Sequence, residues 1–105
     1  MNEHHKGIPV ACSLTDAEFR ERERTLLARF RAAVVMKEEL ADGYQFRIRG
    51  DVEAIVATAE LIAAERNCCR FLKFELIASS NIEPVVLRVT GPAGTKDFLE
   101  HTIQL

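Results

Sequence analysis

The strongest constraint on the fold is a short alternating segment that follows an Asp-Gly pair. Tyr44, Phe46 and Ile48 occupy every second position, with polar residues between them. Successive side chains of a β-strand point to opposite faces, so this segment predicts a strand with one face on a core and the other facing water or a partner. The turn at residues 41–43 favours a hairpin, because Asp-Gly supplies the positive φ that tight hairpins require. Residues 33–40 are expected to form its other strand.

The same order, a helix followed by two strands, is expected twice along the chain. Helices are predicted at residues 16–31 and 52–69, and a second pair of strands at residues 72–76 and 85–90. A Gly-Pro-Ala-Gly break then precedes a last helix that begins at Thr95. Apolar residues at helical spacing predict the buried face of each helix: Phe19, Leu26, Leu27 and Phe30 in the first, Ile55, Ala59 and Ile62 in the second, and Phe98, Leu99 and Ile103 in the third.

This order, α-β-β-α-β-β-α, predicts a single α+β domain over residues 8–105, preceded by a flexible tail over residues 1–7. The expected architecture is a four-stranded, mainly antiparallel sheet with helices on one face. If residues 8–13 form a strand, the arrangement becomes ferredoxin-like. The other sheet face would carry Val34 or Val35, Ile77 and Val86, and could be the surface of a homodimer. Scattered surface aliphatics explain these residues equally well.

Charge and hydropathy exclude several classes of partner. The formal net charge of the 105 residues is −2, which gives no general field for nucleic acid or acidic membranes. No apolar stretch is long enough to span a bilayer, and residues 1–7 lack the apolar run of a signal peptide. We therefore expect a cytoplasmic protein. The alternating Arg and Glu residues at positions 20–24 are typical of a solvated helix face.

Three cysteines are the clearest chemical feature: Cys12, Cys68 and Cys69. An odd number without a secretion signal favours free thiols over a disulfide framework. Neighbouring helical residues point about 100° apart, so the adjacent sulfurs can converge on one ligand only if the helix ends there. Two thiolates could then bind a soft ion such as Cu(I), Zn(II), Hg(II) or trivalent arsenic, with Cys12 as a third ligand. Glu65 and Arg66 would support this site.

Other interpretations of the same residues remain open. Cysteine is often a small buried hydrophobe, and Cys69 continues the predicted stripe of the second helix. Glu65 could form a helix-surface ion pair with Arg66 instead of serving the thiols. The sequence has no CxxC pair and no Cys–His spacing of the kind found in zinc motifs, which argues against a structural zinc site. The alternative functions are a non-catalytic dimeric interaction or regulatory module, and a redox protein that uses Cys68 or Cys69.

Two segments resemble a family of small uncharacterised bacterial proteins. They are residues 8–14 (IPVACSL) and residues 65–76 (ERNCCRFLKFEL), and the family's E-R-x-C-C-x-F helix end lies in the second. Residues 91–99 are similar to its G-P-x-G-x-K-x-F-L string. The family pattern commonly has proline after the cysteine pair, where this chain has Arg70. The resemblance implies a fold unit with a signature of Cys12, Glu65, Arg66, Cys68 and Cys69, and it supplies no reaction.

Overall fold

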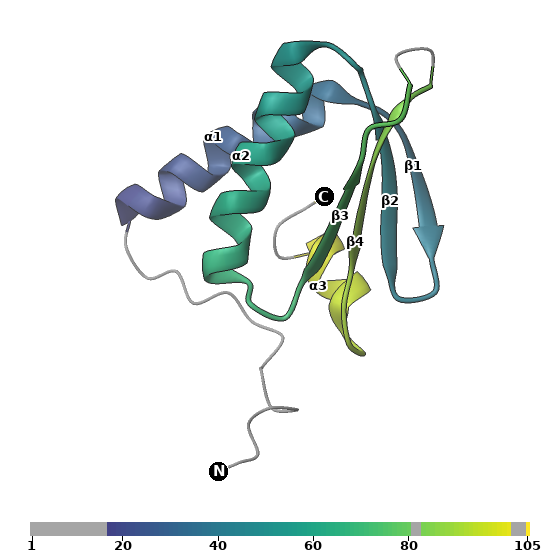
Figure 1. Ribbon diagram of the computed structural model, residues 1–105. Coiled ribbons are helices and arrows are strands. Elements are labelled where there is room, and N and C mark those ends of the chain that lie inside the picture. The colour runs from purple at the N-terminus through teal and green to yellow at the C-terminus, as the bar shows by residue number, and fades with distance from the viewer. Residues whose placement is uncertain (1–16, 81–82, 102–104) are drawn as a thin grey trace.

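The computed structural model describes residues 17–80, 83–101 and 105, and shows helices and strands in the expected order (Figure 1). Residues 8–13, on which the ferredoxin-like extension depends, lie outside the described residues, as do Cys12 and Ile103. The elements are α1 (Ala17–Ala33), β1 (Val34–Leu40), β2 (Gly43–Ile48), α2 (Val52–Cys68), β3 (Lys73–Ile77), β4 (Val85–Thr90) and α3 (Thr95–His101).

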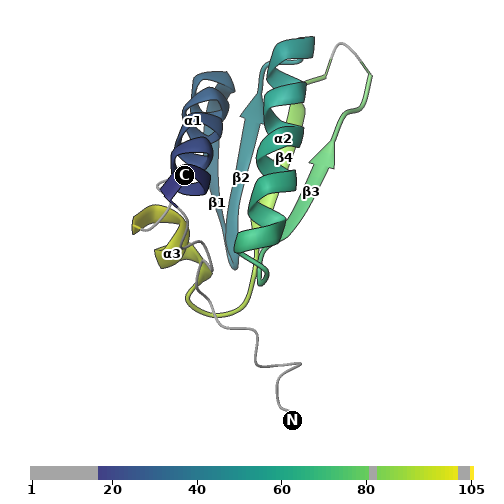
Figure 2. The same cartoon turned by 90° about the vertical axis from the view of Figure 1, so that its left-hand side faces the viewer.

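The four strands form one antiparallel sheet in the order β1-β2-β4-β3. The second strands of the two hairpins pair at its centre, where Phe46 lies opposite Leu87 and Ile48 opposite Val85. Residues opposite each other share a face, so these apolar side chains gather on one side of the sheet. Helices α1 and α2 lie side by side over that side (Figure 2). The predicted fold class, α+β with helices on one face, is confirmed.

The first hairpin forms as expected, but Gly43 is needed for a different reason. Leu40 pairs with Gly43, which leaves Ala41 and Asp42 as the turn, and the described glycine with positive φ is Gly94. A Cβ at position 43 would lie 1.9 Å from the carbonyl oxygen of Val89 on β4. Only glycine allows the backbones to approach so closely. The expectation of positive φ at this position is therefore wrong.

The predicted core face is right for α1 and partly right for α2, where Ile55 and Ile62 pack against the core without forming its main buried face. Leu26, Leu27 and Phe30 are buried, and the Phe30 ring meets Phe46 edge to face at 5.3 Å between centroids. The side chain of Phe19 lies outside the described part of the chain. In α2, Ala59 is exposed, whereas Ile55 and Ile62 are half-buried. The residues of α2 that face the sheet are Ala54, Ala57, Thr58, Leu61, Glu65 and Cys68.

The last helix closes the core beside the first hairpin. Phe98 and Leu99 are buried, and the Phe98 ring packs against Phe71 at 4.9 Å between centroids. Tyr44 donates a 2.6 Å hydrogen bond from its hydroxyl to Glu100 on α3. The Lys37 ammonium lies 4.3 Å from the centre of the Tyr44 ring, in a cation–π contact. These contacts anchor α3 to the inner surface of β1 and β2.

Candidate metal centre

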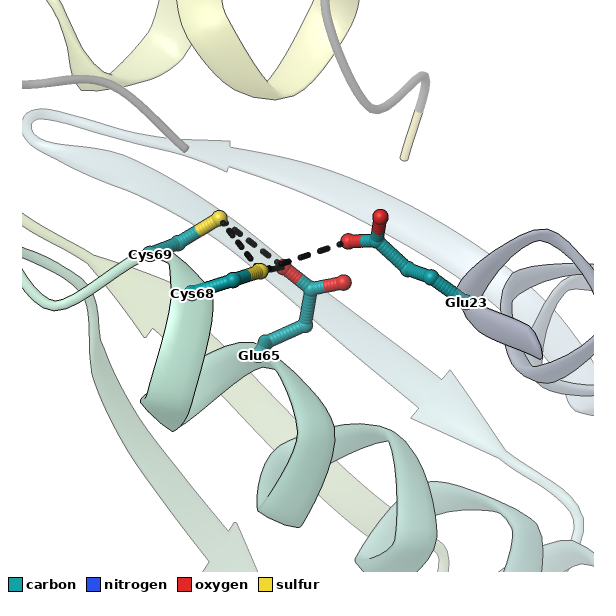
Figure 3. A group of neighbouring side chains, drawn as sticks. All are labelled: Glu23, Glu65, Cys68 and Cys69. Carbon is teal, nitrogen blue, oxygen red and sulfur yellow. Dashed lines mark hydrogen bonds between the residues drawn. The ribbon is translucent and has the colours of Figure 1, made fainter. Parts of the chain in front are cut away.

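Four side chains that can ligate a metal converge where the end of α2 faces α1. They are Glu23 from α1 and Glu65, Cys68 and Cys69 from α2 and the residue that follows it (Figure 3). One ligand atom from each lies within 4.8 Å of those from the other three. All four residues are buried, with Glu65 and Cys69 at 0% exposure. Such a concentration of thiol and carboxyl groups inside a small core is costly unless the groups satisfy one another or a cation.

The helix end brings the two sulfurs together. Helix α2 ends at Cys68, and Cys69 leaves helical geometry with φ −114° and ψ 74°. Its backbone N–H still donates to the carbonyl oxygen of Glu65 at 2.7 Å, so the turn stays tight as the chain departs. The two Sγ atoms consequently lie 3.4 Å apart. The convergence that adjacent cysteines can reach only at a helix end is therefore present.

Glu65 is the hub of the cluster because helical spacing places it one turn before both cysteines. Its Oε1 accepts a hydrogen bond from the Cys69 thiol at 3.0 Å and lies 3.6 Å from the Cys68 sulfur. The Cys68 sulfur is also 3.6 Å from Oε2 of Glu23. Among the described residues, the second oxygen of Glu65 has no hydrogen-bond partner, although it is buried. A protonated Glu65 can share its proton with the neighbouring Glu23 carboxyl, with which it is in contact.

Burial and mutual contact shift both titrating groups toward their neutral forms. Burial, followed by contact with the Glu23 carboxyl, raises the pKa of Glu65 to about 9, although the hydrogen bond from Cys69 opposes the shift. The hydrogen bond with Cys68, then burial and the contact with Glu65, raise the pKa of the Cys69 thiol far above its usual range. In the absence of a cation, Glu65 and Cys69 therefore keep their protons at neutral pH.

The structure brings together three of the residues that sequence reasoning selected and adds one. Cys68, Cys69 and Glu65 form the cluster, and the alternative of a helix-surface ion pair for Glu65 is wrong because its side chain is fully buried. Arg66 is exposed, and no contact joins it to the cluster in the described part of the chain. Cys12 lies outside the described residues.

Glu23 is the site residue that sequence reasoning missed. The alternating Arg and Glu segment of α1 was expected to be a solvated face, and Glu21 and Arg24 do form an exposed pair at 2.6 Å. Glu23 is different, because only 9% of it is exposed. It lies one turn before the buried Leu26 and Leu27, so an acidic residue on an otherwise apolar stripe was the available signal.

The chain was compared with protein-family models, curated proteins and solved structures, and no match was found in any of the three. Within the described ranges, no helix combines the length and apolar character needed to cross a bilayer. The functional argument therefore rests on the geometry of the cluster.

Proposed function

We propose that this protein binds a soft or borderline metal ion through Cys68 and Cys69, with Glu65 and Glu23 as carboxylate ligands. The observation that carries the proposal is the set of four buried ligand atoms within 4.8 Å of one another. The buried second oxygen of Glu65 also supports it, because a cation could bind there in place of the proton that Glu65 otherwise shares with the Glu23 carboxyl. Cys12 remains a proposed third thiolate, which would replace one of the carboxylates at a four-coordinate ion.

The separation of the sulfurs favours a four-coordinate ion over a linear complex. With a metal–sulfur bond of roughly 2.3 Å, two thiolates of a tetrahedral zinc site lie about 3.8 Å apart, and those of a linear complex about 4.6 Å apart. The observed 3.4 Å is close to the tetrahedral value. Two thiolates with two carboxylates are also a ligand set that Zn(II) accepts. Zn(II) is therefore the best geometric fit among the ions considered, and Cu(I) or Hg(II) would have to spread the sulfurs.

A bound cation also resolves the electrostatics of the cluster. The raised pKa values of Glu65 and Cys69 arise because their negative forms are buried next to other acidic groups. A divalent ion reverses that balance, since it stabilises the carboxylate and thiolate forms and releases their protons. The same raised thiol pKa counts against a redox protein, which needs an accessible thiolate of low pKa.

Metal affinity of single-residue variants tests the proposal. Competition with a chromophoric chelator under reducing conditions should show one Zn(II) per chain, with binding lost in Cys68→Ser and Cys69→Ser. Glu65→Gln and Glu23→Gln should weaken Zn(II) binding by about tenfold or more, because each removes an anionic ligand. Their effect on Cu(I) or Hg(II) should be small, since two sulfurs suffice for a linear complex.

Glu60→Gln is the matched control for the carboxylate variants. Glu60 lies on the same helix but is exposed and paired with Arg29 at 2.6 Å, outside the cluster. Cys12→Ser measures whether the third thiol contributes. Circular dichroism of each variant separates loss of a ligand from loss of the fold. Zn(II), Cu(I) and Hg(II) affinities that are unchanged in folded Cys68→Ser and Cys69→Ser proteins would refute the proposed site.

A further inference from the structure

The two edges of the sheet are built differently. Strands β1 and β3 are the outer strands, and each has one side without a neighbouring strand in the described part of the chain. Exposed strand edges pair readily with other chains, so native proteins protect those that must stay single. Bulges, and charged residues that point inward, are two common protections. The presence or absence of these features distinguishes an edge that is kept alone from one that is available for pairing.

The β1 edge carries both protections. Its pairing with β2 shifts between Val34 and Met36, which marks a bulge or irregularity. Lys37 and Glu39 lie opposite Phe46 and Tyr44, so these charged side chains are on the helix side of the sheet. Lys37 donates to the carbonyl oxygen of Leu105 at 2.8 Å, and Glu39 is paired with Lys96. A strand added at β1 would meet this charged border.

The β3 edge lacks a bulge and has no inward-pointing charge: Phe74 and Leu76 are on its helix side, and its charged residues, Lys73 and Glu75, are on the uncovered face. Its register with β4 is regular from Lys73 to Ile77, and Leu76 and Ile77 are 38% and 39% exposed. In Figure 2, helix α2 lies in front of β4, with α1 on one side of it and β3 on the other. The groove between the helices is lined on α2 by Glu60, Ala63, Ala64 and Asn67. By helical spacing, the opposite flank of α2, toward β3, carries Ile55, Ala59 and Ile62. Ala59 is exposed, and Ile55 and Ile62 are partly buried against the core, with part of each side chain still accessible.

The uncovered face of the sheet is less suited to a partner. Arg88 on β4 donates to Gln45 on β2 at 2.7 Å, and Gln45 donates to Glu38 on β1 at 2.8 Å. This chain of hydrogen bonds crosses three strands at the middle of the face. A partner placed there would have to cover polar groups that already satisfy one another, whereas the β3 edge offers unpaired backbone and apolar surface.

We propose that a second copy of this chain docks antiparallel along β3, so that the two sheets join and the α2 flanks of the copies meet above the join. In the register we assign, Phe74 lies opposite Phe74 of the second copy. Lys73 then lies opposite Glu75 of the second copy on the uncovered face, and the two-fold axis generates the same pair again. The strand is thus complementary to itself in both charge and hydrophobicity.

Side-chain alternation and charge select this register from its neighbours. Side chains alternate with a period of two, so a register that keeps the apolar faces together must change the partner of each residue by two positions. The neighbouring registers are therefore centred on the next residues along the strand. Centring the pair on Glu75 would place like charges directly opposite each other, which is destabilising. Centring it on Leu76 would leave Glu75 opposite Ile77. Only the register centred on Phe74 pairs each Lys73 with a Glu75.

Sedimentation of charge variants tests this dimer. In low salt, with reductant and a chelator present, the wild-type chain should show a concentration-dependent dimer. Lys73→Glu and Glu75→Lys should each weaken it by about tenfold or more, because each turns two attractive cross-strand pairs into two repulsive ones. The double variant, with both changes, should restore the dimer. Ile62→Lys should weaken it through the α2 flank.

Two controls separate this interface from its alternatives. Arg47→Glu alters the uncovered face, where Arg47 pairs with Val86 across β2 and β4, and it should leave the dimer intact. Val35→Lys alters the β1 edge, where Val35 is 70% exposed, and it should also have no effect. Circular dichroism confirms that each variant is folded. A wild-type chain that stays monomeric at all concentrations, a dimer lost in Arg47→Glu, or single variants that the double variant does not rescue would overturn the proposal.

Discussion

Tyr44 is the single tyrosine of the chain, and its hydroxyl reports on the contact between β2 and α3. The hydrogen bond to Glu100, together with burial and the carboxylate charge, raises the pKa of Tyr44 to about 12. The same hydrogen bond, with the charge of Lys37, lowers the pKa of Glu100. The phenol and the carboxylate therefore stabilise each other in the protonation states that prevail at neutral pH.

Ultraviolet titration of this one phenol should give a pKa near 12 in the wild-type protein. Glu100→Gln should move the pKa back toward the ordinary value of 10, because the negative charge that opposes ionisation is gone. Since the pKa is raised in the folded state, the stability from this contact is present below pH 10 and is lost as the pH rises toward 12.

Glu83→Gln is the control for this titration, because Glu83 is not among the groups that shift Tyr44. Circular dichroism of the same samples shows whether the fold persists through the titrated range. A Tyr44 pKa that is equal in the wild type and in Glu100→Gln would contradict the assigned hydrogen bond.

At the scale of the element, α2 does the most to shape the molecule, and its orientation differed from expectation. Hydrophobicity predicted a face of Ile55, Ala59 and Ile62, but the helix turns Ala54, Ala57 and Leu61 to the sheet. Small residues let a helix lie close to the strands, and the close contact places Glu65 and Cys68 inside the core. A prediction from apolar periodicity favours the face with the most hydrophobic side chains. The isoleucines therefore led to a different predicted face from the buried one, which is built largely from alanine.

The beginning of α2 depends on Asp51, its N-cap residue. Its Oδ1 accepts a 2.8 Å hydrogen bond from the backbone N–H of Ala54, and that bond, with one from Arg49, lowers the pKa of Asp51. Asp51→Ala should lower the midpoint of thermal unfolding at neutral pH by several degrees, because an N–H at the helix start loses its partner.

Asp51→Asn separates the cap from the charge. Asparagine caps helices about as well as aspartate, so at neutral pH this variant should unfold close to the wild-type temperature. The lowered pKa means that the contribution of the charged cap is present above the ordinary value of 3.8 and is lost as the pH falls through the folded-state value. Wild type should therefore lose stability on acidification relative to Asp51→Asn. Identical unfolding of wild type and Asp51→Ala would rule out the cap.

At the scale of the whole molecule, two similar helix–hairpin units join through their second strands. The joint between β2 and β4 runs from Gly43 opposite Thr90 to Ile48 opposite Val85, and the largest buried side chains flank it. The two units contribute one helix each to the layer above. The cluster of Glu23 with Glu65, Cys68 and Cys69 lies where those helices meet, so the metal centre we propose depends on both units.

Gly43→Ala tests how closely the two units must approach. The added Cβ would lie 1.9 Å from a backbone oxygen of β4, so the central strands must separate. We expect a loss of about 2 kcal/mol or more in the free energy of unfolding, measured with urea. Gly50→Ala is the matched control, since its Cβ would meet a Val85 methyl at an ordinary 3.9 Å. Equal stability of the two variants would contradict the close approach.

Local pattern was sufficient for the elements and for three of the four residues of the cluster. Alternation at Tyr44, Phe46 and Ile48, and the capping residue Asp51, are properties of neighbouring residues, and the structure bears both out. The pairing of Cys68 with Cys69 follows from their adjacency at a helix end. The role of Glu65 as a possible ligand follows from its position one turn earlier.

Tertiary structure alone decided which residues these elements bring together. Glu23 is separated from Glu65 by 42 positions, and no local pattern states that α1 packs against α2 at that point. The burial of Glu65 and the close contact at Gly43 likewise depend on how the two units pack. Packing is set by the shapes of distant surfaces in three dimensions, and periodicity along one segment carries no information about its neighbour.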